Sequence, residues 1–395
     1  MKTPLITLGL LAALSCPAQT NLTAQDALAI AAKNRPALRA ARLRVEQARS
    51  GARALGTPPP LTLGLGASSR AEVGATDGDL FLSQPVDVFG RVSAQRKAGG
   101  AAIRLALADY AKSAAELQSD VLSAYVEAVA AQHRKQVAAD LLKIAESLFA
   151  ATKRRFEEGK VAEMQLTRAS IELARAEQAA SLWRAASEAA LKRLSGELGV
   201  EETLAVEPDA ALAPFSGTGE RPEVLALSAE VEAAEAEAGV ARLGNRPELD
   251  VQLRRSAWNE GSAIYGARVQ LTWALWDHGR SDQESKAARK KAEAARKQLD
   301  DAKARAKAEL AATNVDLEAG QKQLTSYESI LASAKDLVEK SQRAYTEGFG
   351  TQVDVLEATR ALREVEQEFV EARLRLSQTV IAQYRAAGFL SEVLK

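Results

Sequence analysis

The chain contains few of the residues on which disulfide frameworks, metal sites and catalytic centres depend. Its 395 residues include one cysteine and two histidines, so an internal disulfide is excluded, and His133 and His278 stand far apart. Lys and Arg together number 52, as do Asp and Glu, and a neutral total gives no electrostatic attraction for nucleic acid. The glycines fall at expected turns rather than in a phosphate-binding loop. We therefore expect no enzyme, no cofactor, no metal site and no nucleic-acid partner.

Long hydrophobic runs are also absent. No stretch is long and apolar enough for a transmembrane helix, and the run Leu5–Leu14 is instead typical of a secretory signal peptide. Cleavage after Ala18 would make residues 1–18 the signal peptide. Cys16 leaves two interpretations: it becomes a lipidated N-terminal cysteine, or it is discarded with the signal, as Ala13 in place of the preferred Leu favours. The exported chain would be periplasmic, secreted or part of an outer-membrane barrel.

The most abundant residue types favour long helices. Ala, Glu, Arg, Leu and Lys dominate the composition, while aromatic residues make up only 5%, which is thin for two compact cores. The chain is also internally duplicated, since Phe89-Gly90-Arg91 matches His278-Gly279-Arg280, and the same offset brings Glu158-Gly159 onto Glu347-Gly348. We divide the mature chain into a first repeat, an equatorial connector and a second repeat, at residues 19–204, 205–220 and 221–395.

Each repeat is predicted to place a β-hairpin before a very long helix. Leu61, Leu63 and Leu65 alternate with Thr or Gly, and Leu80–Val88 is a second strand-like run. The second repeat alternates in the same way, which is typical of half-buried strands. Segments without proline follow at Val92–Glu157 and Arg280–Thr346. As helices they would each span on the order of 100 Å.

The return helices, at 163–198 and 352–387, are too short to pair with the whole of these long helices. An upper helix at the start of each repeat, ending with a glycine cap at Gly56 or Gly244, would supply the missing length. We predict that 163–198 stacks end to end beneath 222–243, and that 352–387 stacks beneath 36–55.

Four strands per chain cannot close a barrel, and an open sheet edge is not viable in lipid. Two chains would supply eight strands, and three chains would supply twelve with a wider lumen. The alanine-rich helices lack the dense leucine seams of a solid bundle, so they favour the wider tube. A coiled-coil rod that carries small soluble hairpins is the alternative. Trp273 and Trp276 would lie at a membrane interface or serve as packing residues.

Several motifs together are specific enough to suggest a family. One is a helix-capping pair, Thr23 and Asp26, ahead of an Asn-Arg-Pro sequence; the others have the form of strand-to-helix junctions and of a helical turn. They lie at 22–38, 84–91, 271–280 and 345–358. In their order and their duplication they resemble the TolC-like outer membrane efflux proteins, over nearly the whole mature chain.

The resemblance implies a mainly α fold with a small β part. Long α-helical hairpins would form a periplasmic α-barrel, and four strands per chain would contribute to a trimeric twelve-stranded outer-membrane β-barrel. It implies the exit duct of a tripartite efflux or type I secretion system, in the outer membrane of a diderm bacterium and extending into the periplasm. The partners would be two more copies of the chain, a periplasmic adaptor, an inner-membrane pump of the RND or ABC type, and outer-membrane lipid. The alternative function is a non-conducting periplasmic coiled-coil scaffold.

The glycine turns and two nearby acids are the candidate functional residues. Turns at the far ends of the long helices would lie at the periplasmic entrance, so we expect an adaptor to dock on tips formed by Gly159, Lys160, Gly348, Gly350 and Thr351. Asp354 and Glu357 share one helix face, and in a threefold assembly they would form an entrance gate of six carboxylates that attracts cations. The alternative is that they only complement the helix macrodipole.

Overall fold

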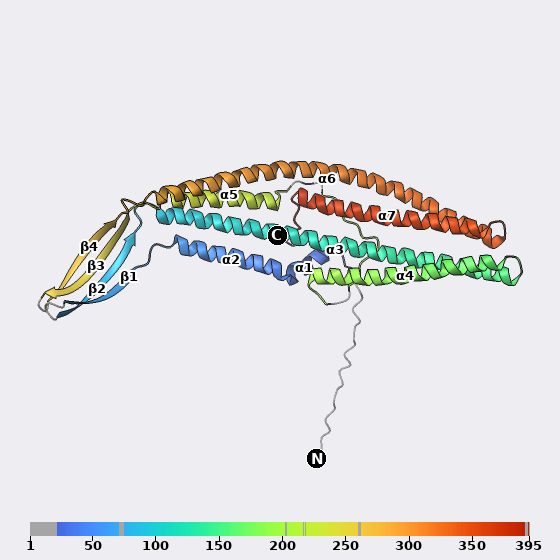
Figure 1. Ribbon diagram of the computed structural model, residues 1–395, viewed down its shortest axis with the longest axis horizontal. Coiled ribbons are helices and arrows are strands. Elements are labelled where there is room, and N and C mark those ends of the chain that lie inside the picture. The colour runs from blue at the N-terminus through green and yellow to red at the C-terminus, as the bar shows by residue number, and fades with distance from the viewer. Residues whose placement is uncertain are drawn as a thin grey trace, which may run out of the picture. The chain divides into compact units, whose positions relative to one another are not determined.

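The structure is a computed structural model, and it describes residues 22–70, 75–201, 204–215, 217, 219–259, 262–391 and 394. The signal peptide expected at 1–18, with Cys16, lies outside these residues. Helices make up most of the described chain, together with four strands (Figure 1). The elements are α1 (Ala24–Asn34), α2 (Pro36–Gly56), β1 (Thr62–Arg70), β2 (Ala75–Val86), α3 (Arg91–Glu157), α4 (Glu163–Leu198), α5 (Pro222–Ala241), β3 (Glu248–Asn259), β4 (Ser262–Thr272), α6 (Arg280–Glu347) and α7 (Gln352–Ala386).

The two long helices predicted from the sequence are confirmed. α3 has 67 residues and α6 has 68, which is about 100 Å each at 1.5 Å per residue. Each is followed by its return helix, α4 or α7 (Figure 1). Left-handed glycines follow all four helices, at Gly159, Gly199, Gly348 and Gly388, where a residue without Cβ satisfies the last carbonyls at least steric cost. Among the described residues, no helix combines the length and the apolar character needed to cross a bilayer.

The upper helices end differently from our expectation of a glycine cap. Gly56 is the last residue of α2, and the hydroxyl of Thr57 donates to the carbonyls of Arg53 and Ala54 at 3.0 and 2.7 Å. α5 ends at Ala241, before Gly244. A side-chain hydroxyl has taken the place of the left-handed residue at the end of α2.

The four strands form one antiparallel sheet in the order β1-β2-β3-β4, so β1 and β4 are its edges. Two successive rows across the sheet are Thr62, Ser83, Gln252, Arg268 and Leu63, Leu82, Leu253, Ala267. Successive residues of a strand point to opposite faces, so the first row belongs to a polar face and the second to an apolar face. β2 begins at Ala75, before the run at 80–88 that alternation predicts.

By its internal packing the chain divides into two compact units. The first combines the described residues up to Asn34 with Asp120–Ala213 and Ala319–Gln378. One apolar cluster of its core lies where α3, α6 and α7 meet, and contains Ala130, Leu331, Ala334, Val338, Ala358, Leu362, Phe369 and Val370. α4 ends in this unit against α1, because a Cβ on Gly199 would lie 3.3 Å from Cβ of Asn34.

The second unit combines Arg35–Ser119, Pro214–Glu318 and the described part of Thr379–Lys395, and contains the sheet. Here the end of α7 lies against the residues that precede α5. The N–H of Gly219 donates to the carbonyl of Ala387 at 2.7 Å, and a Cβ on Gly388 would lie 2.8 Å from the nitrogen of Arg221.

Our prediction of which helices stack was therefore wrong. Each return helix ends at the upper part of its own repeat, α4 at α1 and α7 at α5, instead of at the other repeat. Helix length set the expectation, and the upper helices of the two repeats have nearly equal lengths, so length could not distinguish the two pairings. Close backbone approaches at Gly199, Gly219 and Gly388 decide the pairing that is observed.

Candidate functional site at the helical hairpin tips

The expected docking residues lie in the two turns that end the helical hairpins of the first unit. Gly159 and Gly348 have φ of +69° and +93°, a conformation that disfavours residues with a Cβ. The N–H groups of Gly348, Phe349 and Gly350 all donate to the carbonyl of Ala344, at 3.1, 2.9 and 2.9 Å. A Cβ on Gly350 would lie 3.1 Å from Cβ of Ala344. Phe349 is left 89% exposed, so the turn presents an apolar ring.

The first turn presents charge instead of an aromatic ring. Lys160 closes it by donating its N–H to the carbonyl of Arg155 at 2.8 Å. Its ammonium lies 2.7 Å from the carboxylate of Glu158, and this contact lowers the pKa of Glu158. Both side chains are exposed, so the pair adds little stability and leaves a polar tip.

Tyr345 joins the two hairpins just before the turns. Its ring is 3% exposed, and its hydroxyl lies 3.0 Å from the hydroxyl of Thr152 on α3. The guanidinium of Arg155 lies 4.7 Å from the ring centre and donates to the Tyr345 carbonyl at 2.8 Å. Beside this pair, buried Gln352 donates to the carbonyl of Gln165 at 2.8 Å, which ties α7 to α4. The tip is therefore a cross-linked assembly of four helix ends.

The expected gate residues lie on the first turns of α7. The Thr351 N–H donates to the carboxylate of Asp354 at 2.8 Å, and the Asp354 N–H donates to the Thr351 hydroxyl at 3.3 Å, which makes a capping box. These bonds from Thr351 lower the pKa of Asp354. Val355 and Ala358 are buried, whereas Asp354 and Glu357 are exposed. The helix cap and the expected gate therefore use the same carboxylate.

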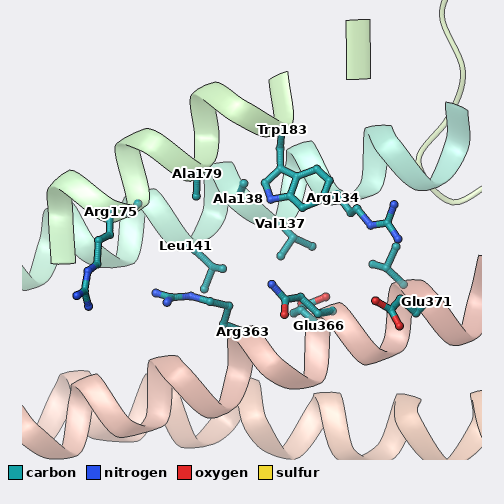
Figure 2. A pocket seen from close by; sticks show the side chains of 13 residues that line it. Arg134, Val137, Ala138, Leu141, Arg175, Ala179, Trp183, Arg363, Glu366 and Glu371 are labelled. Atoms are coloured by element: carbon teal, nitrogen blue, oxygen red, sulfur yellow. The ribbon is translucent and has the colours of Figure 1, made fainter. Parts of the chain in front are cut away.

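A groove of about 450 Å³ runs between α3, α4 and α7 in the same unit (Figure 2). The guanidinium of Arg134 lies 5.5 Å from the ring centre of Trp183. Arg175 and Arg363 approach one carboxylate, that of Glu172, at 3.0 and 3.9 Å. These contacts tie α3 to α4, and α4 to α7, so the groove charges that they involve are paired within the chain.

The two predicted interface tryptophans lie in the second unit, directly after β4. The indole N–H of Trp273 donates to the carbonyl of Asn245 at 3.1 Å, and that of Trp276 donates to Nδ1 of His278 at 2.9 Å. The rings are 53% and 79% exposed. The indole N–H groups are therefore satisfied within the chain, while the rings are left uncovered.

Aspartates begin both long helices, at the strand-to-helix junctions. The carboxylate of Asp87 accepts the N–H groups of Arg91 and Val92 at 2.9 and 2.8 Å, and these bonds outweigh partial burial and lower its pKa. The carboxylate of Asp277 accepts the N–H groups of Gly279 and Ser281 at 3.0 and 2.9 Å, and bonds from Ser281 lower the pKa of Asp277. His278 takes a left-handed φ of +53°, and Asp277 is the cap.

No local sequence pattern indicates the residues that hold the tip together. Tyr345 was recognised only within the turn motif, and its partner Thr152 is 193 positions away, so no local pattern could connect them. His133 was considered only as one of two distant histidines, and its acidic neighbours were not singled out. Within the described residues, no group of three or more His, Cys, Asp or Glu side chains is suited to a metal ion.

Comparisons with known proteins agree on one family. The family model for outer membrane efflux proteins matches residues 27–200 and 218–389. The chain is similar in structure to the outer membrane protein VceC from Vibrio cholerae, with a TM-score of 0.78, 18% identity, and 92% and 96% of the two chains covered. It is also similar to the Campylobacter jejuni CmeC outer membrane channel, with a TM-score of 0.77, 17% identity, and 98% and 93% covered. A comparison with curated protein sequences found no match.

Proposed function

Since the chain belongs to the outer membrane efflux protein family, and is thus an outer-membrane channel protein and not an enzyme, we propose that it acts as a homotrimeric exit duct. Three copies close a twelve-stranded barrel in the outer membrane and continue as an α-helical tunnel into the periplasm. A periplasmic adaptor and an inner-membrane pump of the RND or ABC type deliver the cargo, in a tripartite efflux or type I secretion system. The proposed repeats are 19–204 and 221–395, joined by the connector 205–220.

The two-faced sheet with open edges is the observation that carries this proposal. On its apolar face Leu63, Leu253, Val269 and Leu271 are between 58% and 67% exposed, as lipid-facing residues are in membrane barrels. The backbone groups along the outer edges of β1 and β4 need partners in lipid. Pairing β4 of one copy with β1 of the next closes the barrel, and three copies give a lumen wide enough for passage.

The mass of the purified complex in detergent, together with its conductance in a planar bilayer, tests this function. We expect a trimer and stepwise conductance. A dominant monomer or dimer would contradict barrel closure by three chains. A trimer without conductance would support the non-conducting scaffold instead.

The hairpin tips are the proposed adaptor-docking surface, formed by Gly159, Lys160, Gly348, Gly350 and Thr351. Support comes from their place at the ends of the two hairpins and from the exposed Phe349 ring. Replacing Gly348 by Leu should abolish efflux while the trimer still forms. Gly196→Ala, at a helical position with open space around it, should leave efflux unchanged. If efflux survives in Gly348→Leu, the adaptor docks elsewhere.

Asp354 and Glu357 are the proposed entrance gate, a ring of six carboxylates in the trimer. Asp354→Asn with Glu357→Gln should weaken cation selectivity, measured as reversal potential across a salt gradient. Asn keeps a side-chain oxygen that can cap α7, so the helix start is preserved. The matched control, Glu364→Gln with Glu368→Gln, removes the same charge from exposed positions farther along α7. Equal selectivity in the two double variants would leave Asp354 and Glu357 as helix caps.

Trp273 and Trp276 are the proposed contacts with outer-membrane lipid. Their exposed rings directly follow the last strand, where an aromatic belt would lie. Lipids brominated near the headgroup should quench tryptophan fluorescence in the reconstituted trimer. Trp273→Phe with Trp276→Phe should lose much of that quenching, and unchanged quenching would place these rings away from the bilayer.

A further inference from the structure

A half-buried histidine lies where the connector crosses two helices of the first unit. The side chain of His133, on α3, is 17% exposed. Its Nδ1 lies 3.4 Å from the carboxylate of Asp209 in the connector, and its Nε2 lies 3.9 Å from the carboxylate of Glu366 on α7. Each ring nitrogen therefore faces an acid, and the two acids come from different segments.

The acids are themselves held by cations. Arg373 of α7 donates to the Asp209 carboxylate at 2.7 Å and also to the Asp209 carbonyl. Lys335 of α6 lies 3.0 Å from the other oxygen of Glu366. The contact with Arg373 lowers the pKa of Asp209. Burial opposes ionisation of Glu366, but the nearby His133 imidazole and Lys335 ammonium outweigh burial and lower the pKa of Glu366. Both acids are therefore carboxylates at neutral pH.

A neutral imidazole cannot satisfy this arrangement, because it carries one N–H and one bare lone pair. One carboxylate must then face a nitrogen that offers no proton. Among the described residues, Nδ1 of His133 and Oε2 of Glu366 are buried atoms without a hydrogen-bond partner. The ring of Phe369, 5.9 Å from the imidazole, covers the ring without supplying an acceptor. Two N–H groups, as in the imidazolium, match the two carboxylates.

We propose that His133 is a proton-operated latch that fastens the connector residues 204–213 onto α3 and α7. The present separations of 3.4 and 3.9 Å exceed the 2.7–2.9 Å of a charge-assisted N–H···O bond. A second proton closes both gaps and joins Asp209 to Glu366 through the imidazolium. The connector is thereby held more tightly to both helices. This regulation goes beyond the proposed transport function and does not depend on it.

The pH dependence of the latch has a defined sign. Fastening needs a second proton on the imidazole, so it increases as the pH falls and is lost as the pH rises. At more acidic pH the two carboxylates are protonated in turn. Since the pKa values of Asp209 and Glu366 are lowered, fastening is lost only below the pH range in which free carboxyl groups are protonated.

Hydrogen exchange of the purified full-length protein, read by mass spectrometry on peptides that cover 204–213, tests the latch. Protection factors, corrected for the intrinsic effect of pH, should rise about tenfold between about pH 8 and about pH 6. The rise should vanish in His133→Asn. It should persist in His278→Asn, the matched control, because Asn tolerates the left-handed φ at that exposed position.

A second variant keeps the test decisive if His133→Asn misfolds. Asp209→Asn removes the connector's charge and should abolish most of the rise. Absence of a rise in the unmodified protein would overturn the latch, as would an equal rise in His133→Asn or Asp209→Asn. Conductance is measured separately, so failure of the latch and failure of the proposed duct are distinguishable.

Discussion

The contacts of the Thr152 and Tyr345 hydroxyls predict that removing one of them costs more stability than removing the other. The Thr152 hydroxyl has two contacts, the Leu148 carbonyl at 2.8 Å and the Tyr345 hydroxyl at 3.0 Å. Among the described residues, the Tyr345 hydroxyl has only the second of these contacts. Thr152 is fully buried and Tyr345 is 3% exposed. Removing the Thr152 hydroxyl therefore leaves the Tyr345 hydroxyl without its partner, whereas removing the Tyr345 hydroxyl leaves Thr152 bonded to the Leu148 carbonyl.

The magnitudes follow from what each substitution leaves behind. Tyr345→Phe leaves Thr152 bonded to Leu148, so it should cost about 1 kcal/mol of local stability. Thr152→Val leaves the Tyr345 hydroxyl buried without a partner, which should cost about 2 kcal/mol. The double variant replaces both groups by apolar ones of similar shape, so it should cost less than Thr152→Val alone.

Local opening of the tip, measured by hydrogen exchange on peptides from the ends of α3 and α6, reports these differences. We expect exchange about fivefold faster in Tyr345→Phe and about thirtyfold faster in Thr152→Val. Thr346→Val, at an exposed threonine of the same hairpin, should change local stability by less than about 0.5 kcal/mol. If the double variant costs the sum of the single variants, the two hydroxyls do not share a bond and the reasoning is refuted.

Three further predictions concern glycine and helix caps. Gly348→Ala should destabilise the protein by about 1–2 kcal/mol, because φ is +93°, whereas Gly239→Ala, in α5 with open space around it, should stabilise it by about 0.5–1 kcal/mol in denaturant unfolding. Gly99→Ala would place a Cβ 2.9 Å from Cα of Ala52, so it should lower the thermal midpoint, and an unchanged midpoint would contradict that approach of α2 to α3. Asp87→Asn should remove the contribution of Asp87 to the pH dependence of stability. Because the pKa of Asp87 is lowered in the folded protein, that contribution is present above about pH 4 and is lost as the pH falls. Identical profiles of stability against pH for the two proteins would refute this.

The sequence predicted the long helices closely because their signal is local. α3 and α6 lie in segments without proline, and each is followed by a left-handed glycine, so each residue contributes to the prediction independently of distant contacts. The same is true of the capping pair Thr23–Asp26, whose expected bonds are present at 3.3 and 3.2 Å. Alternation in the strands predicted the two faces of the sheet, although β2 begins earlier than the pattern indicates.

Contacts between distant segments were not predictable in this way. The pairing of return helices with upper helices was wrong because two equivalent repeats offer two pairings of nearly equal length. Only close backbone approaches, such as that of Gly388 to Arg221, distinguish them.

By itself, the sequence determined where helices, strands and turns lie, that the chain is duplicated, and which face of each strand is apolar. These properties follow from periodicity and from the backbone preferences of proline and glycine, which act over a few residues. Tertiary structure alone decided which helix ends meet, that Tyr345 shares a bond with Thr152, and that His133 lies between Asp209 and Glu366. Such contacts join residues that are far apart along the chain, and only the packing of the helices brings them within bonding distance.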